Sequence, residues 1–180
     1  MKNFVFFSAF LCMLLVCSAA AQDNMSQGER LKSPFMLSLF NPVQVPNDAT
    51  DVYGMRLGLI YAESHDMTGL DISLVGITTG KAAGIQCGIV QIAEDASLGW
   101  QLGCVNVASD SYAGLQTGVF NYAGYISGAQ LGVINKANYV SGFQIGLINV
   151  TERMIGFQIG LINIIETNDC SFMPVLNCYF

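Results

Sequence analysis

The chain has 180 residues, of which 52% are hydrophobic and only 11% are charged, and its formal net charge is −6. Soluble domains usually carry about 25% charged residues, so this composition favours a chain that is embedded in a membrane or stacks apolar faces. The acidic balance argues against a nucleic-acid partner, because binding to phosphates requires clustered Lys and Arg.

The chain opens with an export signal, to which we assign residues 1–21. Lys2 begins it, an apolar run follows, and Ala19–Ala21 forms a cleavage site of the A-x-A type. The alternative is a lipoprotein signal in which Cys17 is acylated. After the signal, residues 22–33 form a polar lead-in. We therefore expect an exported protein of the outer membrane or the cell surface.

Residues 34–180 form a single domain built from copies of one motif, clearest where GFQIGLIN recurs. Eight units begin with a glycine at spacings of 14 or 15 residues, and segments starting at Pro34 and Cys170 add two more. A fixed period of this kind indicates one structural unit copied many times. The leading glycines are Gly54, Gly69, Gly84, Gly99, Gly114, Gly128, Gly142 and Gly156.

Within each unit, polar and apolar residues alternate when positions are counted from the leading glycine as zero. Position two is Gln from the third unit onward, position four is Gly in seven of the eight units, and position seven is Asn from the fourth unit onward. Positions one, three and five are mostly large and apolar. Alternation predicts a strand, and two glycines would cost a helix about 2 kcal/mol. Each unit is therefore predicted to be one strand and a short polar turn.

Ten such strands can close into an antiparallel meander, an all-β barrel of the outer-membrane type. The uncharged run in each unit is close to the about 9–11 residues of a tilted membrane strand. The chain also ends on an aromatic residue, Phe180. In this register Gln158 lies opposite Gly146, the Phe/Ile/Leu face meets lipid, and the Gln/Gly face lines a narrow interior. This structural or porin-like barrel is the main interpretation, with outer-membrane lipid and the assembly machinery as partners.

The alternative is a parallel β-solenoid with one coil per unit, in which identical residues stack into Gln, Asn and Gly ladders. It is favoured by the short apolar band of the barrel, roughly 15–20 Å against the usual ~25 Å. Such a solenoid would be a surface-exposed interaction or adhesion module. A soluble sandwich or barrel with the Phe/Ile/Leu face inside is a third arrangement.

The glutamines at position two are the candidate functional residues, either as a pore lining or as a ladder. Their simpler interpretation is structural packing against glycine. The ligand or solute that such a lining or ladder would serve stays unknown. The residues are Gln86, Gln101, Gln116, Gln130, Gln144 and Gln158.

We expect no enzyme and no cofactor, because the sequence contains no convincing catalytic or metal site. The one histidine, His65, lies between Ser64 and Asp66, but neighbours in a turn rarely point together, so we expect a solvated turn. The four cysteines beyond the signal form no CxxC pair, which argues against zinc and leaves their disulfide state open. The glycines precede no helix and therefore form no phosphate-binding loop.

The repeat GFQIGLIN, the opening PFMLSLFNPVQ and the ending FMPVLNCYF together resemble one bacterial family. It is the family of surface repeat-containing proteins built from GLQ(I/L)GL(I/V)N units, and the likeness covers about residues 33–180. The resemblance implies an exported envelope protein and carries over no catalytic residue. The chain departs from the pattern at Ser73, Cys170 and Pro174, and a proline would interrupt the ladder of a central strand.

Overall fold

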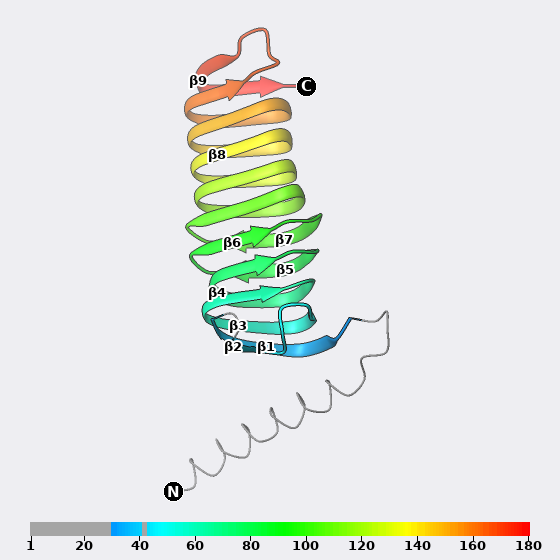
Figure 1. Cartoon of the computed structure of the whole chain (residues 1–180). Coiled ribbons are helices and arrows are strands. Elements are labelled where there is room, and N and C mark those ends of the chain that lie inside the picture. The colour runs from blue at the N-terminus through cyan, green and yellow to red at the C-terminus, as the bar shows by residue number, and fades with distance from the viewer. Residues whose placement is uncertain (1–29, 41–42) are drawn as a thin grey trace, which may run out of the picture.

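The computed structural model describes residues 30–40 and 43–180, so the predicted signal peptide lies outside the described residues. All regular elements of this part are β-strands, and none of it forms a helix suited to crossing a membrane. Figure 1 shows the strands wound into coils that stack in one column, with β1 near one end and β9 at the other. The strands are β1 (Lys32–Phe40), β2 (Val43–Val45), β3 (Asp51–Ser64), β4 (Met67–Thr78), β5 (Ala82–Cys87), β6 (Val90–Ala93), β7 (Ser97–Leu102), β8 (Val105–Ile165) and β9 (Phe172–Tyr179).

Successive units pair in parallel and in register, so the fold is a β-solenoid rather than the antiparallel barrel of the main interpretation. Gly69 pairs with both Gly54 and Gly84, one in each neighbouring coil. The predicted opposition of Gln158 and Gly146 is wrong, because Gln158 bonds to Gln144 instead. The physical reason is that a buried amide needs a hydrogen-bonding partner, which another glutamine provides and a glycine side chain cannot.

The second and third glycine-led units each have two segments that pair separately with the neighbouring coils, rather than the single strand predicted. The first half of β4 pairs with β5, and its second half, from Val75 to Thr78, pairs with β6. β8 continues this winding without a break over 61 residues. In such a coil, the side chains at positions two and seven lie inside, and those at positions one, three and five lie outside.

Both ends of the solenoid depart from the parallel winding. β1 pairs in parallel with β3, with Phe35 opposite Met55, so the Pro34 segment is a unit as predicted, whereas β2 folds back antiparallel on β1. The Cys170 segment is not a further stacked unit, because β9 runs antiparallel to the last coil. Within β9, Pro174 lacks an N–H and Val175 has a φ of +72°, which interrupts regular pairing. β9 therefore closes the column instead of extending it.

The leading glycines sit where the backbones of consecutive coils approach closely. At Gly142 and Gly156 the φ angles are +138° and +139°, in a region that other residues rarely adopt. A Cβ at Gly156 would lie 1.8 Å from the carbonyl oxygen of Gly142. The repeated glycine is therefore a requirement of the coil geometry and not a functional signature.

The interior holds two apolar clusters beside the two columns of amides. The largest apolar cluster runs through the later coils and consists of Ala108, Tyr112, Ala123, Ile126, Ala137, Val140, Met154 and Ile165. The Phe/Ile/Leu positions lie outside, with Leu147 51% exposed, so the third arrangement is also wrong.

Candidate functional site

The six glutamines at position two form one internal ladder of side-chain hydrogen bonds. From Gln101 onward, each Nε2 donates to the Oε1 of the glutamine one coil earlier, over 2.6–3.0 Å. The Nε2 of Gln130 also donates to the carbonyl oxygen of Lys136. None of the six residues is more than 3% exposed. The glutamines are thus out of reach of ligands in solvent.

The asparagines at position seven form a second ladder of the opposite direction. From Asn106 to Asn149, each Nδ2 donates to the Oδ1 of the asparagine one coil later, over 2.7–2.8 Å. From Gly103 onward, the second glycine of each unit makes room for this ladder; a Cβ at Gly146, for example, would lie 2.6 Å from Nδ2 of Asn135. Because the two ladders point in opposite directions, the dipoles of their amides oppose each other along the column.

Unpaired atoms in the two ladders occur at their ends. Nε2 of Gln86 has no acceptor at the start of the Gln ladder, and Oε1 of Gln158 has no donor at its end. Oδ1 of Asn106 is unpaired at the start of the Asn ladder. The inner rungs satisfy one another, so the ladders stabilise the interior through repetition.

A buried ion pair takes the place of the Gln ladder in the first two glycine-led coils. Nη2 of Arg56 donates to Oδ2 of Asp71 over 2.5 Å, and both side chains are fully buried. Nη1 of Arg56 donates to Oγ of Ser64 and to a backbone carbonyl. Ser73, which replaces the second glycine of its unit, donates to the other oxygen of Asp71. Ser73, which departs from the repeat pattern, is therefore part of this polar network.

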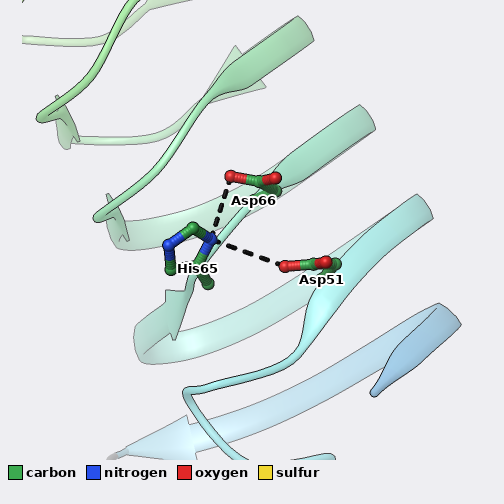
Figure 2. A group of neighbouring side chains, drawn as sticks. All are labelled: Asp51, His65 and Asp66. Carbon is green, nitrogen blue, oxygen red and sulfur yellow. Dashed lines mark ion pairs between the residues drawn. The ribbon is translucent and has the colours of Figure 1, made fainter. Parts of the chain in front are cut away.

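The adjacent residues Ser64, His65 and Asp66 do not all point together. Ser64 is buried and bonded to Arg56, whereas the side chain of His65 is 30% exposed. Figure 2 shows His65 between two carboxylates, Asp66 and Asp51. Nδ1 of His65 lies 3.0 Å from Oδ1 of Asp66 and 3.5 Å from Oδ1 of Asp51. The ligand atoms of these three residues lie within 4.8 Å of one another, so the group could hold a metal ion.

One outer surface of the column is largely apolar, and we call positions one, three and five of the eight glycine-led units the apolar face; Thr117 is the one residue with a hydroxyl group among them. No charged residue occupies any of these positions. Many of the side chains are well exposed, including Leu59 at 70% and Leu161 at 66%. Phe143 and Phe157 stack on one another from neighbouring coils, with ring centroids 5.4 Å apart.

The apolar face deepens into a groove of about 1150 Å³ where β1 and β2 meet the first coils. Its few polar side chains have partners within the protein: Ser38 donates to Tyr61, Gln44 donates to Glu63, and Ser73 donates to Asp71. The groove therefore offers an apolar surface with little free hydrogen-bonding capacity.

Two tyrosines have perturbed acidities. Burial raises the pKa of Tyr112 well above its ordinary value, although a hydrogen bond with the backbone of Gln101 opposes the shift. Burial, followed by a hydrogen bond to Glu63, raises the pKa of Tyr61 to about 12. Neither tyrosine is poised near neutral pH, so neither is suited to acid–base chemistry there.

The four cysteines in the described residues are free thiols. Cys87 and Cys104 occupy positions three and five of their units, within the apolar face. Cys170 and Cys178 are exposed near the C-terminal end.

No family model, curated protein or solved structure matches this chain. The resemblance to the surface repeat-containing family therefore stays a prediction.

The sequence analysis overlooked Asp51 as a neighbour of His65. The repeat could have revealed this neighbour, because Asp51 precedes Asp66 by 15 residues, which is one period. In a parallel solenoid, residues one period apart lie side by side, but the antiparallel barrel does not place them so. The partnership of Arg56 and Asp71 could have been found in the same way.

Proposed function

We propose that this chain is a non-enzymatic interaction module of the bacterial envelope, whose apolar face binds an uncharged surface of a partner protein. The uncharged, exposed apolar face carries this proposal. Soluble monomers rarely expose contiguous apolar patches larger than a few hundred Å² unless the patch has a function. Here such side chains recur in every glycine-led coil.

The distribution of charge supports the choice of this surface. In the glycine-led units, charged residues occur only at the buried Arg56 and Asp71 or from position eight onward. The apolar face thus has a charged border on one side, as protein interfaces have apolar centres and polar rims. Aromatic residues such as Trp100 and Phe143 add the side chains that contribute most to binding.

The buried polar residues support a structural role rather than catalysis. The Gln and Asn amides bond to each other and to the backbone, so they have few groups left for a substrate. An export signal and a place at the outer membrane or cell surface belong to this proposal, since an interaction module acts where its partners are.

Photo-crosslinking in intact envelopes tests the proposed face. A photoreactive amino acid at Leu147, in the apolar face, is expected to give protein adducts. The same probe at Glu152, on the charged border of the same coil, is the matched control and is expected to give few. Equal labelling from both sites, or adducts with lipid alone from Leu147, would contradict a protein-binding face.

A further inference from the structure

We propose that Asp51, His65 and Asp66 form a binding site for a divalent transition-metal ion of the Zn²⁺ type. The site lies at the charged border of the first coils, separate from the apolar face. Asp51 begins β3 and Asp66 precedes β4, and the pairing of Val52 with Met67 places the two carboxylates side by side. Like charges directly opposite one another destabilise a sheet unless a cation lies between them.

The hydrogen bonds within the group leave one carboxylate oxygen unsatisfied. Nη1 of Arg30 contacts the ring nitrogens of His65. A guanidinium group has donors only and contacts the same ring nitrogens that a metal ion would use. Oδ1 of Asp51 is buried without a hydrogen-bond partner.

The separation of the ligand atoms matches a tetrahedral metal site. Zinc bonds to imidazole nitrogen and carboxylate oxygen are about 2.0–2.1 Å long, which puts two ligand atoms of a tetrahedron about 3.3 Å apart. The distances from Nδ1 of His65 are 3.0 Å to Asp66 and 3.5 Å to Asp51. One imidazole with two carboxylates suits Zn²⁺ and its neighbours better than Mg²⁺ or Ca²⁺, which prefer oxygen ligands only. Three protein ligands leave the fourth position to water or to a partner's side chain.

The backbone of the next coil approaches this group closely. A Cβ at Gly80 would lie 2.1 Å from Oδ1 of Asp66 and 2.6 Å from Cε1 of His65. The backbone N–H of Lys81 donates to the same Asp66 oxygen over 2.8 Å, which fixes that carboxylate. Glycine at position 80 is thus needed for the two ligands to keep their places. Arg30, in contrast, competes with a metal ion for the histidine ring.

Titration of the purified chain with Zn²⁺ tests the proposal, because the protein contains only one histidine. Calorimetry measures the affinity, and the imidazole signals of His65 in NMR spectra identify the ligand independently of the thiols. We expect saturable binding that shifts the His65 signals. We expect His65→Gln and Asp51→Asn to weaken binding by at least about tenfold, since loss of even an outer-shell partner typically costs 10–100-fold.

Two further variants make the test specific. Asp95→Asn removes an exposed carboxylate from a turn two coils further along the column and is expected to leave the affinity unchanged. Arg30→Gln removes the competing cation and is expected to tighten binding, a result that general damage to the fold would not produce. Absence of saturable binding, Zn²⁺ binding that leaves the His65 signals in place, or equal affinity in His65→Gln would each overturn the proposal.

Discussion

The first two glycine-led coils and the six that follow are stabilised by different buried interactions, although their backbones wind in the same way. In the first two, Arg56 and Asp71 form an ion pair to which Ser64 and Ser73 add hydrogen bonds. In the six that follow, each glutamine bonds to an identical neighbour. The ion pair depends on one particular partner, whereas a ladder of identical amides can be lengthened by adding coils.

This difference has an energetic consequence. A charge in the interior is costly to leave unpaired, while a neutral amide costs about 1–3 kcal/mol per unsatisfied group. Loss of one residue should therefore damage the ion-pair coils more than the ladder coils.

Asp71→Asn should have the largest effect, because it leaves the buried guanidinium of Arg56 without a counter-charge. We expect the free energy of unfolding to fall by about 3–5 kcal/mol, the usual cost of breaking a buried ion pair. Urea denaturation measures the change. Asp95→Asn in an exposed turn is the control and should change the stability by less than about 0.5 kcal/mol. Equal effects of the two substitutions would mean that the charge of Asp71 is unimportant.

Gln130→Leu should cost about 3 kcal/mol, because it leaves two ladder neighbours unpaired, each at about 1–3 kcal/mol. Oε1 of Gln116 loses its donor and Nε2 of Gln144 loses its acceptor. The terminal residue Gln158 bonds to one ladder neighbour only, and both glutamines also donate to a backbone carbonyl, so Gln158→Leu should cost about two-thirds as much. Denaturation of both variants under the same conditions gives the ratio. A terminal substitution as costly as the central one would contradict a ladder of independent rungs.

The double variant Arg56→Gln/Asp71→Gln should extend the ladder into the first coils. We expect its stability to stay within about 1 kcal/mol of the parent, since a buried ion pair gives little net stabilisation over a neutral replacement. Each single variant leaves one buried charge and should be much less stable. The coupling energy from the complete double-mutant cycle is the measurement. Additive losses would show that the first coils cannot accept the amide arrangement.

The effect of alkaline pH should be smallest and should depend on Tyr112. Among the described residues of the six ladder coils, Tyr112 is the one buried side chain that can ionise. Burial raises the pKa of Tyr112 in the folded chain, so the neutral side chain contributes its full stabilisation of the fold below a pH of about 10, the pKa of an unfolded tyrosine. This stabilisation is lost as the pH rises further. Tyr112→Phe should reduce this alkaline loss of stability. If stability depended on pH in the same way in Tyr112→Phe, another group would be responsible for the alkaline loss of stability.

The sequence alone predicts the repeated unit and its class of secondary structure. Strict alternation around Gln144 and Gln158 indicates strands, and the period of 14 or 15 residues indicates one coil or one hairpin strand per unit. The alternation cannot choose between these two, because it reads the same in a parallel and an antiparallel pairing. The prediction therefore included the correct solenoid but ranked the barrel above it.

The tertiary structure decided the direction of pairing and, with it, every contact between units. Parallel register places Gln158 on Gln144 and Asp51 beside Asp66, residues that are one period apart in the chain. It also puts the amides inside and Leu147 outside, the reverse of a usual apolar core. The physical reason is that buried amides must be hydrogen-bonded, and only the stacking of identical units gives each one a partner. The sequence determined which residues recur, and the stacking determined which of them meet.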